Sequence, residues 1–312
     1  MKTLPALLLA AAAAVPLLHL NSYVMHLLIL VIMWATVGMA WNLLGGYCGQ
    51  VSFGHAAFFG VGAYTSGLLY AKAGVSAWWG LPASVAVVGA FALLFGAVFL
   101  RLRGPYFALG TLAASVILGI TAGNLVDVTG GDLGIMIRER TWVGKTGYFY
   151  VALALAAATY AVVVKLVGSR LGYYFLAIRE DQDAAESIGI DTTRVKTAAL
   201  AISAVLTGLA GAFYTNYMGY IDPKVVFALH DVSILAIMVV MVGGVATFAG
   251  PVVGAAIMVL LEEAVRSLPR LGAAHHTIFG ALLIAIILFL PNGVVGDFRK
   301  LKALVRPRGR SS

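Results

Sequence analysis

The feature that most constrains this chain is a series of apolar stretches, each about as long as a membrane is thick. A helix needs about 20 mostly apolar residues to cross a bilayer. Stretches of roughly this kind lie at residues 4–20, 22–43, 50–71, 77–100, 105–126, 148–168, 197–219, 232–247, 250–266 and 273–291. Some of them are short, so the pattern predicts about eight to ten transmembrane helices. We therefore predict an all-α, polytopic integral membrane protein.

The composition supports this fold class and excludes several functions. Of the 312 residues, 61% are hydrophobic and 11% are charged, whereas a soluble domain carries roughly 25% charged residues. The single cysteine, Cys48, excludes a disulfide framework and a cysteine-based metal cluster. No set of nucleophile, base and orienting group is visible, so we expect neither an enzyme nor a metal site. The net charge of +8 indicates loops on an anionic inner leaflet, in contact with membrane lipid, rather than binding to nucleic acid.

The distribution of basic residues predicts the orientation. With the N-terminus inside, 14 of the 21 Lys and Arg residues fall in the cytoplasm, as the positive-inside rule requires. Both termini are therefore predicted to be cytoplasmic, with a transmembrane domain over 1–296 and a short basic tail over 297–312. Residues 1–20 are interpreted as a first transmembrane helix, with a cleaved signal peptide as the alternative.

A glycine-rich segment, GGYCGQVSFGHAAFFGVGAY at 45–64, interrupts the apolar pattern. Glycines let membrane helices approach closely and let the backbone turn. Irregular backbone at membrane depth persists only where it is buried in protein or lines a cavity. Gln50, Ser52 and His55 supply polar groups for such a wall, and Tyr64 helps to shape it. The alternative is that Ser52 and His55 only hydrogen-bond across helices.

A weaker echo of this segment, GGVATFAGPVVG, lies at 243–254. The apolar run before it, Val232–Val242, is too short to cross a bilayer unaided. Interrupted apolar segments in two halves of a transporter point toward the transport site.

Two polar regions stand outside the apolar stretches. Residues 127–147 are predicted to form an external loop with a tight turn at 129–132. Residues 169–196 carry nine of the 34 charges and are predicted to form a cytoplasmic loop.

Within the cytoplasmic loop, residues 179–189 (REDQDAAESIG) are predicted to form one short amphipathic helix. Acidic residues suit its N-terminal end and Gly189 its C-terminal stop. Ala184, Ala185 and Ile188 fall on one face at helical spacing. This small apolar face beside acidic residues favours docking into a protein groove over binding to lipid; a solvated loop is the alternative. A membrane body with such a helix suggests a transporter subunit powered by a separate partner.

Four stretches carry a family resemblance: WNLLGGYCGQVSFGHAAFFGVGAYTSGLL (41–69), TGGDLGI (129–135), LAIREDQDAAESIGIDTTRVK (176–196) and GGVATFAGPVVGAAIMVLLEE (243–263). They resemble the LivM-type permeases of ABC importers for branched-chain amino acids. The resemblance implies a membrane signature for the substrate pathway that comprises Gln50, Ser52, Gly54, His55 and Tyr64. It also implies a loop coupled to an ATPase, which includes Arg179, Glu180, Asp183, Ala185, Glu186 and Gly189.

The resemblance further implies the partners. They are a LivH-like second permease, two LivG/LivF-like ATPases that use ATP, and an external or periplasmic substrate-binding protein. This chain itself is expected to bind no cofactor and to lie in the bacterial inner membrane. Asp132 departs from the smaller or amide residue of many relatives. Relatives that carry urea, short amides or aromatic acids remain alternatives for the substrate, as does a stand-alone secondary carrier or an intramembrane enzyme that uses His55.

Overall fold

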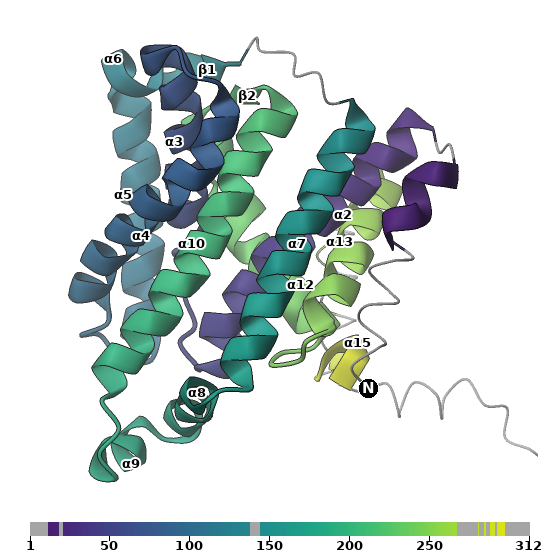
Figure 1. The fold of residues 1–312 in the computed structure, drawn as a ribbon. Coiled ribbons are helices and arrows are strands. Elements are labelled where there is room, and N and C mark those ends of the chain that lie inside the picture. Colours follow the sequence, from purple (N-terminus) through teal and green to yellow (C-terminus); the bar gives the residue numbers. More distant parts are fainter. Residues whose placement is uncertain are drawn as a thin grey trace, which may run out of the picture.

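The computed structural model describes residues 12–18, 21–137, 144–266, 280, 284, 288–290 and 292–296. They form a bundle of long helices (Figure 1). The long helices are α2 (Ser22–Trp41), α3 (His55–Ala73), α4 (Gly80–Phe99), α5 (Pro105–Asn124), α7 (Lys145–Val167), α8 (Arg170–Glu180), α10 (Thr192–Met218), α12 (Leu235–Gly243) and α13 (Gly250–Arg266). The short elements are η1 (Val15–Leu18), η2 (Asn42–Tyr47), η3 (Ala77–Trp79), α6 (Val126–Thr129), η4 (Gly131–Leu133), β1 (Ile135–Met136), α9 (Gln182–Ser187), β2 (Tyr220–Ile221), α11 (Pro223–Val226), η5 (Leu229–Ile234) and α15 (Gly293–Gly296).

The predicted all-α polytopic fold is confirmed. Six helical segments of the described residues are long and apolar enough to cross a membrane: Ser22–Tyr47, Ala77–Phe99, Pro105–Asn124, Lys145–Val167, Thr192–Met218 and Pro223–Gly243. Two further predicted segments correspond to α3 and to α13, which has 17 residues. Segments 4–20 and 273–291 lie largely outside the described residues, so the count of about eight to ten stays a prediction.

Apart from α8, consecutive long helices run through the bundle in alternating directions, and the two polar regions lie at opposite ends (Figure 1). Helices α8 and α9 lie at one end, and α6, β1 and β2 lie at the opposite end (Figure 1). At this second end Lys145 Nζ donates to the Ser22 carbonyl (2.8 Å) and Lys72 Nζ donates to the Asp127 carbonyl (2.5 Å). We refer to these as the α9 end and the β1 end.

Glycines allow a close contact between the backbones of α3 and α10. A Cβ on Gly62 would overlap the carbonyl of Gly208, and a Cβ on Gly211 would overlap the carbonyl of Phe59. Only glycine therefore lets the two backbones touch at these positions.

Three predicted boundaries differ from the structure. The segment predicted at 50–71 is helical only from His55, and the one predicted at 232–247 begins earlier, at Pro223. The predicted loop 127–147 contains ordered elements, because β1 pairs antiparallel with β2 and places Ile135 opposite Ile221. The tight turn predicted at 129–132 is confirmed, since Gly130 and Gly131 have φ of 78° and 55°.

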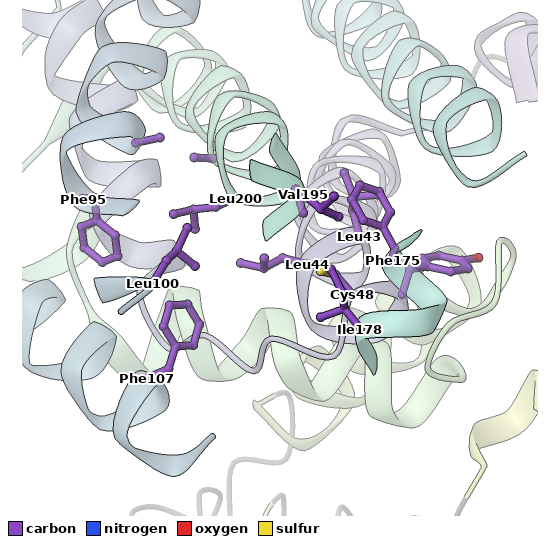
Figure 2. Close-up of a cluster of buried hydrophobic side chains, with 14 of the residues drawn as sticks. Leu43, Leu44, Cys48, Phe95, Leu100, Phe107, Phe175, Ile178, Val195 and Leu200 are labelled. Atoms are coloured by element: carbon purple, nitrogen blue, oxygen red, sulfur yellow. The ribbon is translucent and has the colours of Figure 1, made fainter. Parts of the chain in front are cut away.

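A buried hydrophobic cluster closes the α9 end of the bundle (Figure 2). Leu43 and Leu44 of η2 and the adjacent Cys48 are fully buried there. They pack with Phe175 and Ile178 of α8 and with side chains of α4, α5 and α10, among them Leu100, Phe107 and Leu200. This cluster joins α8 to the glycine-rich segment.

Candidate functional site

The central feature of the site is a break in the helical backbone between η2 and α3. Helix α2 continues as the π-helix η2 to Tyr47, and regular structure resumes only at His55. Gly49 has φ of 72°, and a Cβ there would lie 3.0 Å from the Arg179 Cα, so the left-handed glycine allows α8 to approach the break. Backbone that is not helical within a membrane protein's spanning region needs hydrogen-bond partners from the protein itself.

Side chains from distant elements provide those partners. The Phe53 N–H donates to Thr111 Oγ1 of α5 (3.1 Å). The Phe53 carbonyl accepts from Ser233 Oγ of η5 (2.7 Å), and the same Ser233 oxygen accepts from the Ala56 N–H at the start of α3 (2.8 Å). One serine therefore bridges the two sides of the break.

His55 is fully buried and its proton position follows from its neighbours. Ser203 Oγ donates its single proton to the Ala40 carbonyl (2.6 Å), so it accepts from His55 Nε2 (2.9 Å). Nε2 therefore carries a proton, and Nδ1 is buried without a partner among the described residues. This arrangement links α2, α3 and α10.

The other predicted pathway residues occupy different environments. Ser52 is fully buried; its Oγ accepts from the Gly54 N–H (3.0 Å) and its carbonyl accepts from Trp41 Nε1 (2.8 Å). Gln50 is half-buried. Tyr64 lies further along α3, 5% exposed and stacked on Phe227. The structure gives Ser52 and His55 packing contacts, and the lining of a pathway by these residues stays a prediction.

A second break, at 244–249, follows α12 and lies against η2, the helix just before the first break. The buried Asn42 of η2 donates from Nδ2 to the Thr247 carbonyl (3.0 Å) and accepts at Oδ1 from the Ala246 N–H (2.9 Å). The ring of Tyr47, in the first glycine-rich segment, lies 5.7 Å from the ring of Phe248, in the second, between centroids. The two segments are therefore in direct contact, although they are some 200 residues apart in the sequence. Sequence reasoning missed Asn42, whose side-chain amide lies three residues before Gly45-Gly46.

The predicted single helix over 179–189 is wrong. Asp181 is extended (φ −158°, ψ 113°), and its Oδ1 caps α9 by accepting from the N–H groups of Asp183 (2.9 Å) and Ala184 (3.0 Å). Arg179 and Glu180 consequently end α8, and only 182–187 form the second helix. An aspartate that caps one helix cannot continue the previous one, because it leaves the helical conformation.

The apolar face predicted for Ala184, Ala185 and Ile188 is also wrong, because the three side chains do not share one environment. Ala185 is 2% exposed and packs into the core of the chain, whereas Ala184 is exposed and Ile188 is 76% exposed. Gly189 has φ of 88° and ends the segment. The outward surface of α9 therefore includes Ile188 but excludes the side chain of Ala185.

An ionic network fastens α9 to the loop between α4 and α5. Arg103 contacts Asp183 (2.6 Å) and Glu186 (3.4 Å). Glu186 Oε1 also accepts from Thr192 Oγ1 (2.6 Å) and Gln182 Nε2 (2.9 Å). These hydrogen bonds, first that of Thr192, lower the pKa of Glu186, and the bond to Asp183 raises the pKa of Arg103.

A buried lysine extends the network into the bundle. Lys196 of α10 is 2% exposed, and its Nζ donates to Gln182 Oε1 (3.2 Å) and to the Leu100 carbonyl (3.4 Å). We call Arg103, Gln182, Glu186, Thr192 and Lys196 the α9 anchor. Sequence reasoning missed Lys196 because a lysine in a charged stretch indicates a solvated loop.

At the β1 end, a cleft of about 380 Å³ lies between α5 and α11. Asp132, on its rim, forms an ion pair with Lys224 (2.8 Å). No group of three or more His, Cys, Asp or Glu residues with metal-binding geometry occurs within the described part of the chain.

Comparison with known proteins gives the family. Residues 23–287 match the model of the permease component of branched-chain amino acid transport systems. The chain is 28% identical over 288 residues to the high-affinity branched-chain amino acid transport system permease protein LivM of Salmonella typhimurium, which covers 83% of this chain and 67% of the relative. It is 23% identical over 284 residues to LivH of Escherichia coli, covering 84% and 91%.

A more distant relative is the L-arabinose ABC transporter permease protein AraH of Azospirillum brasilense, 26% identical over 67% of this chain and 63% of its own length. No solved structure matches the chain. The relatives are membrane permease proteins rather than enzymes, and the resemblance noted in the sequence is confirmed. The chain belongs to the family of permease components of branched-chain amino acid transport systems.

Proposed function

We propose that this chain is a membrane subunit of an ABC importer that moves branched-chain amino acids inward while partner subunits hydrolyse ATP. The observation that carries the proposal is the position of α9. It lies outside the membrane-spanning helices, at one end of the bundle, and is fastened to the α4–α5 loop and to α10 by the α9 anchor (Figure 1). A force applied to α9 is therefore transmitted to helices that cross the membrane.

The surface offered to an ATPase consists of the outward side of α9 and the turn after it. Ile188 is exposed beside a cleft of about 430 Å³. The cleft is lined by Leu171, Tyr174, Ile188, Gly189, Ile190, Asp191, Arg194 and Val195. The Asp183 side chain is 79% exposed at the edge of the same surface. An apolar residue next to a cleft with a charged rim is typical of a protein docking site.

The assembly follows from this surface and from the family. We expect a LivH-like second permease, two LivG/LivF-like ATPases that bind ATP, and an external or periplasmic binding protein. We place the chain in the bacterial inner membrane with the α9 end and both chain termini in the cytoplasm. Arg101, Arg103, Arg170 and Arg194 lie at or near the α9 end, which agrees with the positive-inside rule.

The choice of branched-chain amino acids rests on the family and on the LivM and LivH relatives. The AraH relative is named for L-arabinose, and a pocket for an apolar side chain discriminates by only about 1–3 kcal/mol per methylene. Urea, short amides and aromatic acids are therefore tested as competitors beside leucine, isoleucine and valine, in an uptake assay in which the cognate binding protein delivers the substrate.

The docking role is tested by Ile188→Asp in the transporter expressed with its partners. We expect the ATPases to be lost from the purified assembly, or to hydrolyse ATP without uptake, while the chain still inserts into the membrane. Leu133→Asp, at an 84% exposed residue of the β1 end, is the matched control and leaves the ATPases bound. Full coupled uptake by Ile188→Asp would contradict the proposal. Uptake by the chain alone in liposomes under a proton or sodium gradient would support the secondary carrier instead.

A further inference from the structure

Asp231 is the one acidic residue in the six candidate spans of the described residues. The basic residues of those spans lie close to a helix end: Lys145, Lys165, Arg194, Lys196 and Lys224. Asp231 instead lies well inside the span Pro223–Gly243. An ionisable residue within a membrane segment indicates a functional site, because lipid does not solvate a charge.

Hydrogen bonds place Asp231 near the middle of the bundle. Two residues later, Ser233 bridges the Phe53 carbonyl and the Ala56 N–H at the start of α3. At the same end of α3, His55 bonds to Ser203, which lies near the centre of α10. Asp231 is therefore close to the helix break and lies well inside the span Pro223–Gly243.

The side chain of Asp231 is accessible on the surface of the described part of the chain. The residue is exposed, and within the described part of the chain its side chain forms no hydrogen bond or ion pair. It belongs to η5, a π-helical segment, and such segments are frequent at functional sites. An exposed carboxylate at this depth requires water or a polar ligand beside it, since lipid would disfavour its charge.

The chemistry of the Asp231 side chain indicates the class of ligand. A carboxylate without a partner among the described residues is suited to an ammonium group, which it binds through a charge-assisted hydrogen bond.

We propose that Asp231 binds the α-ammonium group of an amino acid as it crosses the membrane. This assignment rests on the proposed function for the class of substrate. It differs from the pathway residues predicted from the sequence, because it places the charged contact on η5 rather than on the segment 45–64.

The test compares L-leucine with its 2-hydroxy analogue, 2-hydroxy-4-methylpentanoate, which has the same side chain and a hydroxyl in place of the ammonium. Binding is measured in nanodiscs on the assembly in which the chain is expressed, without the binding protein and without nucleotide. We expect the wild type to bind leucine at least about tenfold more tightly, the size of one charge-assisted hydrogen bond. Asp231→Asn should remove that preference and leave the affinity for the hydroxy acid unchanged. Asp127→Asn, an exposed acid at the β1 end, is the control and keeps the preference.

Several results would overturn the assignment. They are an unchanged leucine preference in Asp231→Asn, an equal loss of both ligands, and no binding of leucine by the wild type. Dissociation of the second permease in Asp231→Asn would assign the carboxylate to an ion pair between subunits and would also overturn it. If Asp231→Asn does not assemble, Asp231→Glu keeps the charge and must keep the preference. The assay needs no ATP hydrolysis, so its result can be interpreted even if the ATPase docking test fails.

Discussion

The side chain of Asn42, in η2 just before the first helix break of this permease, is hydrogen-bonded to the backbone of Thr247 in the second break. The amide of Asn42 donates to the Thr247 carbonyl at 3.0 Å and, through its oxygen, accepts from the N–H of the preceding Ala246 at 2.9 Å. Asn42 is 1% exposed, so neither half of this contact is replaced by water when the side chain is removed. The contact therefore fixes the second break against η2.

Asn42→Ala is expected to lower the free energy of unfolding by about 1–3 kcal/mol, the cost of leaving a buried donor and acceptor unpaired. Thermal unfolding of the purified chain in nanodiscs measures the change. Asn124→Ala is the control, because Asn124 is exposed and bonds only to Ile120 within its own helix. It should change stability by less than about 0.5 kcal/mol. Equal effects of the two substitutions would show that Asn42 does not fix the second break against η2.

The membrane helices could be predicted from the sequence because their positions depend on a local quantity, the length of an apolar run. Segments 105–126 and 148–168 correspond to α5 (Pro105–Asn124) and α7 (Lys145–Val167). The start of α3 could not be predicted in this way. It is set by hydrogen bonds from Thr111 and Ser233, which come from parts of the chain far from the break.

In the candidate site, too, features that depend on contacts between distant parts of the chain could not be predicted from the sequence. The apolar run at 232–247 excluded Asp231 because a charge normally marks the edge of a membrane segment, whereas the structure extends that segment back to Pro223. The charged stretch at 169–196 could be recognised in the sequence as lying outside the apolar segments, but its division at Asp181 and the inward direction of Ala185 depend on tertiary contacts. Periodicity alone does not report which side of a short helix meets the core.

Gly62→Ala and Gly211→Ala are each expected to destabilise the chain by about 1–3 kcal/mol or more, because an added Cβ overlaps backbone atoms that cannot move aside cheaply. Gly89→Ala in α4 is the matched control. Its Cβ would lie 3.5 Å from Val205, an ordinary contact, so it should be neutral or stabilising by up to about 1 kcal/mol. The yield of monodisperse protein and the unfolding temperature check both statements. A stable Gly211→Ala would argue against direct backbone contact between α3 and α10.

Lys196→Met is expected to release α9 while leaving the helices of the bundle intact. The substitution removes the contacts of Nζ with Gln182 and with the Leu100 carbonyl. Amide hydrogen exchange in 184–187 should accelerate by at least about tenfold, since a hydrogen bond from a charged group contributes about 1.5–3 kcal/mol. Lys165→Met, the same change at an exposed lysine of α7, should leave that exchange unaltered. Unchanged protection of α9 in Lys196→Met would remove this lysine from the α9 anchor.

Acidification should loosen α9 through Glu186. Hydrogen bonds from Thr192 and Gln182 lower the pKa of Glu186 below its ordinary value of 4.5. A carboxyl group with a lowered pKa stabilises the folded state above the unfolded value, and this contribution is lost as the pH falls through the folded pKa. A nitroxide label on Ile188→Cys should therefore stay immobile above pH 4.5 and become mobile below it. In the Glu186→Gln background the label should be mobile throughout, with no transition. A transition that persists in that background would show that Glu186 is not the group responsible.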